Sequence, residues 1–215
     1  MRKLILKMSI SIDGFVGGPN GEIDWLLKSL DEGTTAWLLD TLWKAGVHIM
    51  GSRTFYDMAS FWPYSTEPVA APMNEIPKVV FSKKGLGGYL NQRLTTRAYK
   101  DATLLRTADG SKHSSVISPA AGTWQDAQVA TGDLATEIML LKQEPGNDIL
   151  AHGGASFAQS LTALGIVDEY QLLIHPVALG TGLTLFSALP KPLHLKLVNS
   201  QTFNSGAVAH IYREA

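Results

Sequence analysis

The stretch His152–Phe157 has the composition of an anion-binding turn. It reads His-Gly-Gly-Ala-Ser-Phe, and it stands between the short apolar run Ile149–Ala151 and a segment with helical apolar spacing. A strand that turns through two glycines into a helix presents free backbone N–H groups at the positive end of the helix dipole, which suits a phosphate or diphosphate. Gly153 and Gly154 have no Cβ, so the backbone there can adopt a positive φ and approach an anion closely. The same pattern also occurs in turns that bind nothing, so the motif by itself predicts either a phosphate site or a tight turn.

The elements that position this turn alternate along most of the chain. Residues 3–12 alternate between apolar and polar side chains, which predicts a strand with one buried face. Thr34 or Thr35 is expected to cap a helix that Gly46 stops. Further strands are expected at residues 47–50, 78–81, 127–130, 169–175, 193–198 and 208–212, and further helices after residues 54, 133 and 157.

This order of elements predicts an α/β fold. Strands that alternate with helices pair in parallel through right-handed crossovers, whereas the last strands, which have no helix between them, are expected to be antiparallel. Val208–Tyr212 is the strand expected at the C-terminal edge, where a second copy could pair. We therefore expect a mixed, mostly parallel sheet with helices on both faces, and ligands at the carboxyl ends of its strands.

Composition restricts the class of protein. The chain has 215 residues, a formal net charge of −1 and no cysteine. It is therefore expected to form a single domain over residues 1–215, without disulfides, thiolate metal sites or cysteine nucleophiles. The small net charge argues against nucleic acid or a membrane surface as a partner, and no His, Asp or Glu set has metal-ligand spacing. Because the chain shows neither a signal peptide nor an apolar run of about 18 residues, the expected compartment is the cytoplasm.

Residues 85–123 depart from the alternation of strands and helices. This segment is polar and ends in a stretch rich in Ser, His, Ala and Gly. A hairpin is expected around residues 108–111, and we interpret the whole segment as a polar insertion on the surface.

Seven short motifs cover nearly all of the chain outside that insertion. They are Ser11–Phe15, Asp24-Trp25, Gly51–Phe55, Val80–Ser82, Gly132–Leu134, Ile149–Ser156 and His175–Gly180. In this order they resemble the dihydrofolate reductase fold, and within it the reductase domain of the riboflavin-biosynthesis deaminase/reductase and its stand-alone bacterial relatives. The resemblance implies a three-layer αβα sandwich around a sheet of about eight strands, a nicotinamide cofactor, and a homodimer joined through terminal strands.

The resemblance also implies that two turns flank the phosphates of NADPH. Arg53, in the first turn, offers a permanently charged donor fork, although an exposed arginine also serves in surface ion pairs. Ser82 and Lys83 follow a strand where the family holds adenosine, and positive charge there favours NADP over NAD. The expected cofactor residues are Gly51, Ser52, Arg53, Thr54, Ser82, Lys83, Gly153, Gly154, Ala155, Ser156 and Phe157.

One acid and three aromatic residues are the candidates for the substrate side. By resemblance, the Asp-Gly loop after the first strand lies beside nicotinamide and substrate, so Asp13 is expected to bind substrate or assist proton delivery. Asp-Gly is also a common turn pair, so a purely structural role stays open. Trp25, Phe61 and Trp62 could wall an aromatic heterocycle or pack in the core.

The expected activity is reduction by hydride transfer from the nicotinamide. In dihydrofolate reductase, a carboxylate on the first long helix binds the pterin ring of folate. In the corresponding segment Thr35–Leu42, Asp40 is the only acid and lies toward the far end of the helix, so folate reduction is disfavoured. The aminouracil ribose phosphate of riboflavin synthesis calls for a basic pocket, for which the sequence offers only Lys7, Arg93 and Arg97. We therefore expect an NADPH-dependent reductase of a small heterocyclic or carbonyl/imine compound, with 5-amino-6-(5-phosphoribosylamino)uracil as the named candidate. The alternative is an NADP-binding sensor or scaffold without turnover.

Overall fold

The computed structural model describes residues 1–87 and 122–215. The hairpin expected around residues 108–111 and most of the expected insertion lie outside these ranges. In chain order the described elements are β1 Leu4–Ser11, β2 Phe15–Gly17, the 3₁₀ helix η1 Asp24–Ser29, α1 Glu32–Trp43, β3 Ala45–Gly51, α2 Ser52–Phe61, η2 Trp62–Tyr64, α3 Ala70–Glu75, β4 Lys78–Phe81, α5 Gly122–Gln125, β5 Gln128–Ala130, α6 Leu134–Gln143, β6 Asp148–Ala151, α7 Ala155–Ala163, β7 Glu169–His175, β8 Leu183–Thr184, β9 Leu195–Thr202 and β10 Val208–Glu214.

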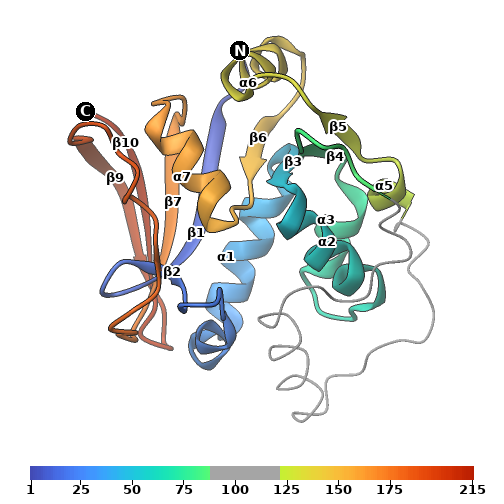
Figure 1. Ribbon diagram of the computed structural model, residues 1–215. Helices are drawn as coiled ribbons and strands as arrows, with labels where there is room; N and C mark the ends of the chain where they lie inside the picture. The colour runs from blue at the N-terminus through green and yellow to red at the C-terminus, as the bar shows by residue number, and fades with distance from the viewer. Residues whose placement is uncertain (88–121) are drawn as a thin grey trace.

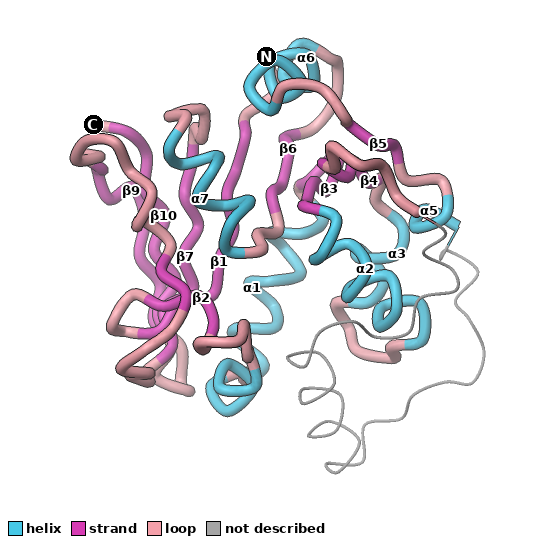
Figure 2. The backbone as a smooth tube through the Cα atoms, in the orientation of Figure 1, coloured by secondary structure: helices cyan, strands magenta, loops and turns pink. Residues whose placement is uncertain are grey.

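An eight-stranded mixed sheet organises the fold, with the strand order β5-β4-β3-β6-β1-β7-β10-β9. The strands from β5 to β7 pair in parallel, whereas β10 is antiparallel to both β7 and β9. Figure 2 shows these strands in magenta, with β9 and β10 at the end of the sheet away from β4 and β5. The expected mostly parallel sheet with an antiparallel C-terminal end is confirmed. Because the six parallel strands share one direction, their carboxyl ends meet at one edge of the sheet, where ligands bind in folds of this kind.

Helices cover both faces of the sheet, as a three-layer sandwich requires (Figure 1). One core cluster joins the sheet to α6 and α7, and a second joins it to α1, α2, α3 and α5. The alternation in β1 decides which side chains enter the first cluster: Leu4, Leu6, Met8 and Ile10 are buried in it. Lys7 alternates with these residues and therefore points to the other face of the sheet.

The start and end of α1 differ from the sequence expectation. Asp31, not Thr34 or Thr35, is the N-cap: its carboxylate accepts the Thr34 N–H at 2.7 Å, and the Thr34 hydroxyl accepts the Asp31 N–H at 2.7 Å. This reciprocal pair satisfies two N–H donors, whereas a lone threonine cap would satisfy one. Gly46 does not stop the helix but lies inside β3, where an added Cβ would be 2.9 Å from the Asn147 carbonyl oxygen. Close approach of two backbones therefore explains this glycine.

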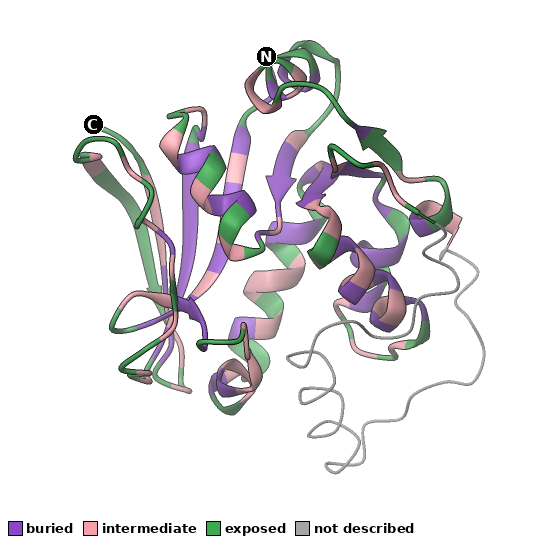
Figure 3. Cartoon of the chain, in the orientation of Figure 1, coloured by how far each residue is buried: buried purple, intermediate pink, exposed green. Residues whose placement is uncertain are grey.

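The C-terminal strands also require a correction. β10 cannot be the free edge, because β7 and β9 pair with its two sides. β9 is the edge strand, and it runs over Leu195–Thr202 rather than over residues 193–198. Figure 3 shows β9 as largely exposed at this end of the sheet. The small β2–β8 sheet and the helices η1, η2 and α3 were not anticipated. Within the described ranges, no helix has both the length and the apolar character needed to cross a membrane.

Candidate active-site cavity

The two glycine turns open into one cavity of about 950 Å³. Their strands explain why: β3 and β6 are parallel neighbours with Ile49 opposite Ala151, so both chains leave the sheet at the same edge. The chain enters α2 directly after β3, and it enters α7 through three residues after β6. Eleven of the expected site residues line this cavity, namely Gly51, Ser52, Arg53, Thr54, Phe61, Trp62, Gly153, Gly154, Ala155, Ser156 and Phe157.

Glycine is required where the two turns touch. Gly153 has a φ of +58°, and Gly154 has a φ of +68° with a ψ of 130°, a combination that L side chains rarely adopt. A Cβ on Gly154 would lie 2.6 Å from the Thr54 hydroxyl oxygen, and one on Gly51 would lie 3.4 Å from the Phe157 Cβ. A Cβ on Gly154 would therefore collide with the Thr54 side chain, whereas one on Gly51 would make an ordinary contact.

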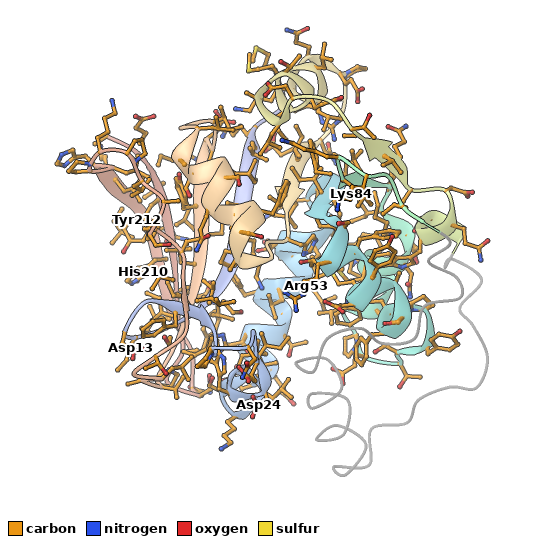
Figure 4. The ribbon with its side chains drawn as sticks, in the orientation of Figure 1. Asp13, Asp24, Arg53, Lys84, His210 and Tyr212 are labelled. Carbon is orange, nitrogen blue, oxygen red and sulfur yellow. The ribbon has the colours of Figure 1, made fainter. Side chains whose placement is uncertain are left out.

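Two helix N-termini face this cavity, and both have the features of an anion site. Gly51 is the N-cap of α2 and Gly154 is the N-cap of α7, and no described side chain caps either helix. The first N–H groups of each helix thus carry partial positive charge without a side-chain acceptor. Arg53, in the first turn of α2, is exposed and adds a guanidinium to the same cavity (Figure 4). Two dipoles and one fixed charge on one cavity suit the phosphates of a dinucleotide.

An aromatic pair lies next to the two glycine turns. Phe81, the last residue of β4, is opposite Gly51 in the sheet and lines the cavity. Its ring centroid is 5.3 Å from that of Phe157. Ser82 and Lys83, which were expected to bind the adenosine end of the cofactor, do not line the cavity. The Ser82 hydroxyl donates to the Gly85 carbonyl at 2.7 Å, and Lys83 is exposed.

Lys7 and His152 provide the polar groups of the cavity floor. Burial lowers the pKa of the Lys7 ammonium to about 8. Burial, together with the positive charges of Lys7 and Lys78, lowers the pKa of the His152 imidazole to about 3. His152 packs edge-on against His48, with ring centroids 4.4 Å apart, and its Nε2 has no partner among the described residues. The floor therefore combines a lysine that readily gives up a proton with a neutral histidine.

The opposite wall of the cavity is mostly apolar. It is formed by side chains of β2, η1, α1, α2, η2, α3 and β8 and of the segments that lead into η1 and α3. Phe61 is buried and Trp62 is half-buried in this wall, and the Trp62 indole nitrogen is buried without a partner among the described residues. These two aromatics were expected on the substrate side, and they lie on the cavity. The other apolar members are Val16, Ile23, Leu26, Leu27, Leu30, Leu38, Leu42, Met58, Val69, Met73 and Leu183.

Asp13, the expected catalytic acid, does not line the cavity. Its carboxylate accepts the Ser11 hydroxyl at 2.6 Å, the Gly180 N–H at 2.7 Å and the Leu179 N–H at 2.9 Å. These three donors hold the pKa of Asp13 below its ordinary value, the Ser11 hydroxyl most strongly. Figure 4 shows Asp13 well apart from Arg53, on the side of the C-terminal strands. The carboxylate thus ties the loop after β7 to the end of β1.

Trp25 also lies outside the cavity lining. It is 8% exposed, its indole N–H donates to the Glu22 carbonyl at 3.0 Å, and its ring packs edge-on against His175. Ser29 completes this contact through a 2.6 Å hydrogen bond to the His175 Nδ1. Trp25 therefore holds η1 to the end of β7, and its contribution to the cavity is indirect.

Helix α1 presents no acid to the cavity. Asp40 instead faces a second hollow of about 360 Å³, and its carboxylate oxygen is 2.5 Å from the Lys44 Nζ. The α1 residues that line the main cavity are Thr35, Leu38 and Leu42. An acid on this helix that could hold a pterin ring is therefore absent, in agreement with the expectation from the sequence.

Asp57 lines the cavity but was not predicted from the sequence. It is 4% exposed and lies one helical turn beyond Arg53, so both side chains reach the cavity from α2. The four-residue spacing between Arg53 and Asp57 places them on the same face of α2, and this spacing could have predicted Asp57 as a cavity residue. Among the described residues, no group of three or more His, Cys, Asp or Glu side chains could hold a metal ion.

Comparison with known proteins agrees with this arrangement. A profile of the family described as the RibD C-terminal domain matches residues 2–209. The chain belongs to the RibD C-terminal domain family. The uncharacterized Bacillus subtilis protein YyaP is 32% identical over 213 residues, which cover 98% of this chain and 94% of YyaP.

Two solved structures show the fold that the RibD C-terminal domain family shares. A putative riboflavin biosynthesis protein from a Shewanella species matches with a TM-score of 0.66 at 20% identity and covers 100% of this chain and 99% of its own. A Thermotoga maritima diaminohydroxyphosphoribosylaminopyrimidine deaminase/5-amino-6-(5-phosphoribosylamino)uracil reductase matches with a TM-score of 0.61 at 17% identity; the match covers 100% of this chain and 57% of that longer one. The dihydrofolate reductase-like fold is thus confirmed.

Proposed function

We propose that this protein is an NADPH-dependent reductase of a small carbonyl, imine or heterocyclic compound. The observation that carries the proposal is the meeting of two glycine-capped helix N-termini and Arg53 on one cavity. The N-cap glycines leave the first N–H groups of both helices without a side-chain acceptor, which fits a ligand held by backbone N–H groups. Members of the RibD C-terminal domain family are typically NADPH-dependent reductases, which supports the choice of cofactor.

The residues present divide the work of binding. The N–H groups at the starts of α2 and α7 hold the diphosphate, which NADPH and NADH share. Arg53, exposed at the cavity and always charged, binds the 2′-phosphate that only NADPH carries. The dihydronicotinamide, when bound, supplies the hydride. The apolar wall excludes water from the place of transfer.

Lys7 is the proposed proton donor. It lines the cavity from β1, the strand between β6 and β7, and burial brings its pKa to about 8, close to the working pH of a cytoplasmic enzyme. The ammonium is the form that donates, so kcat should fall as the pH rises through about 8. Lys7→Met should lower kcat and abolish this limb of the pH profile without changing NADPH affinity. Lys3→Met is the matched control, because Lys3 directly precedes β1 and does not line the cavity.

Titration with NADPH and NADH, followed by nicotinamide fluorescence, tests the cofactor assignment. We expect NADPH to bind with a Kd well below 1 mM, the affinity that corresponds to only about −4 kcal/mol. Absence of binding by either nucleotide at that concentration contradicts the proposal. Binding without oxidation by any carbonyl, imine or aminouracil substrate would favour the sensor or scaffold alternative.

A homodimer joined through β9 is the proposed assembly. β9 is the edge strand, and Leu197 and Val198 on it are 47% and 46% exposed. An edge strand with unpaired backbone groups is a natural site of pairing between copies. Light scattering should give twice the chain mass of 23.2 kDa, and a proline at Val198 should give the monomer. A monomeric wild-type protein contradicts this assembly.

A further inference from the structure

We propose that Gln171 positions the proton donor Lys7 by accepting a hydrogen bond from its ammonium, a proposal that rests on the reductase function above. Lys7 of β1 and Gln171 of β7 are directly opposite each other in the parallel pairing of these two strands. Side chains at such positions point to the same face of the sheet, and neighbouring strands lie only about 4.8 Å apart. The register of the sheet therefore places the two side chains next to each other.

Both side chains lie on the face of the sheet that α1 covers. Leu173, two residues after Gln171 and on the same face of β7, packs against Trp37 of α1. Lys7 lines the main cavity, and Gln171 lines the second hollow of about 360 Å³; α1 contributes residues to both. The Lys7–Gln171 pair therefore stands at the boundary between the two hollows.

A chain of hydrogen bonds fixes the orientation of the Gln171 amide. The Gln171 Nε2 donates to the Glu169 Oε1 at 2.8 Å, and the Arg213 Nε and Nη2 donate to the Glu169 Oε2 at 3.0 and 2.9 Å. Because a carboxylate only accepts, the amide must turn its NH₂ group toward Glu169. Its oxygen, on the other branch of the amide, is buried and has no hydrogen-bond partner among the described residues. Since an unpaired buried acceptor is costly, a donor that reaches this oxygen stabilises the fold.

Lys7 is the donor opposite this oxygen. Burial lowers its pKa to about 8, and no hydrogen-bond acceptor among the described residues offsets that effect. The flexible four-carbon stem of lysine lets the ammonium turn from the cavity toward β7. A hydrogen bond to the ammonium favours the charged form, so pairing with Gln171 keeps the proton on Lys7 until a substrate atom takes it. Gln171 thus holds the donor both protonated and in one place.

His152 is the competing acceptor on the other side of Lys7. It follows the last registered pair of β1 and β6, Leu6 with Ala151, and its Nε2 is also buried without a partner among the described residues. Within the lining, η1 and α1 contribute only uncharged residues. The other titratable or charged groups around Lys7 are Glu169 and His175 of β7, Arg53 and Asp57 of α2, and Glu67 before α3.

NMR titration of the cofactor-free, full-length protein tests the pairing, with lysine isotope-labelled at Cε and the Lys7 signal identified by its absence from Lys7→Met. Gln171→Met keeps an unbranched side chain and removes the acceptor, so the pKa of Lys7 should fall by at least about one pH unit from its wild-type value. Gln201→Met, the same substitution in the lining of the second hollow but on β9, should leave that pKa unchanged. An unchanged pKa in Gln171→Met, or an equal fall in Gln201→Met, overturns the proposal. A fall in His152→Phe but not in Gln171→Met assigns the ammonium to His152 and also overturns it.

Two further measurements connect the pairing to catalysis and to the wild-type protein. In Gln171→Met the alkaline limb of kcat should move down with the pKa of Lys7 while the NADPH Kd stays unchanged; a limb that stays at the wild-type pH overturns the positioning role. A crystal structure of the wild-type protein at pH 6, which needs no variant to fold, should show the Lys7 Nζ within about 3.2 Å of the Gln171 Oε1. An ammonium bonded elsewhere, with that oxygen unpaired, contradicts the pairing. Failure of the reductase function is read separately, since it appears as absence of NADPH binding or oxidation, and the NMR titration requires neither.

Discussion

Gly154→Ala should impair both the fold and the cofactor site, because this residue has an unusual backbone conformation and a close neighbour. At a φ of +68° and ψ of 130° the backbone lies in a region that alanine avoids, at a cost on the order of 1–3 kcal/mol. The new Cβ would lie 2.6 Å from the Thr54 hydroxyl oxygen, so the threonine side chain must leave its rotamer, which adds about 0.5–1.5 kcal/mol. We therefore expect the free energy of unfolding to fall by about 2–4 kcal/mol.

Gly165→Ala is the matched control for this substitution. Gly165 also has a positive φ, +63°, but a Cβ there meets nothing within 4 Å, and it lies after α7 rather than before it. It should cost about 1 kcal/mol from the left-handed backbone alone. Urea denaturation measures the free energy of unfolding of both variants. Substitutions of Thr54 then separate the backbone cost of Gly154→Ala from the cost of the collision with the Thr54 side chain. Thr54→Ala should recover the steric part in the double variant, whereas Thr54→Val, which keeps a methyl group in place of the hydroxyl, should not.

The same variants report on ligand binding. Displacing the first turn of α7 moves the N–H groups proposed to hold the diphosphate, so Gly154→Ala should weaken NADPH at least about tenfold, equivalent to about 1.4 kcal/mol. Gly165→Ala should bind NADPH like the wild type. If Gly154→Ala is no less stable than Gly165→Ala and binds NADPH normally, the contact between the two turns has no role in the site.

Three further outcomes are expected. Arg53→Ala should weaken NADPH binding by about 10- to 100-fold and NADH binding by much less, since a charged hydrogen bond to phosphate is worth about 1.5–3 kcal/mol. Lys191→Ala, which removes an exposed charge outside the cavity, is the control and should change neither Kd. Equal losses of affinity for both nucleotides would assign Arg53 to the diphosphate. Burial lowers the pKa of His152 to about 3 and of His175 to about 4, so below pH 6.5 the unfolded chain binds more protons than the folded chain. The free energy of unfolding, measured with urea, should be highest above pH 6.5 and fall by about 2 kcal/mol for each residue by pH 5. A free energy that does not change between these pH values would show that the two rings are protonated in the folded protein. Asp13→Ala removes the acceptor of the Leu179 and Gly180 N–H groups, so it should speed hydrogen exchange at these amides and leave the NADPH Kd unchanged. A loss of turnover with exchange rates like those of the wild type would instead indicate that Asp13 takes part in catalysis.

The sheet and the positions of the two glycine turns were predictable because their signals are local. The alternation in residues 3–12 follows from the pleat of a strand, and the apolar run before His152-Gly153-Gly154 follows from burial on both faces. Parallel order then brings the ends of β3 and β6 together, so two motifs that are about a hundred residues apart in sequence share one cavity. Neither step required knowledge of the side-chain packing.

Other features depend on tertiary contacts that no local pattern records. The Asp13 carboxylate accepts hydrogen bonds from the backbone N–H groups of Leu179 and Gly180, and Trp25 packs on His175. In each case the partner lies more than 140 residues away in the sequence. Gly46 had the appearance of a helix stop, but the backbone of Asn147 explains it. The position of β10 inside the sheet depends on its pairing with β9 as well as β7, and the sequence of a strand does not record which strands pair with it.

The crystal structure of the NADPH complex tests most directly whether the two glycine turns form a cofactor site. We expect the diphosphate against the amide nitrogens at the starts of α2 and α7, with the nicotinamide toward Lys7 and the 2′-phosphate at Arg53. A complex in which the nucleotide occupies another surface, or in which the diphosphate contacts neither helix start, would contradict the proposed site and the reductase function derived from it.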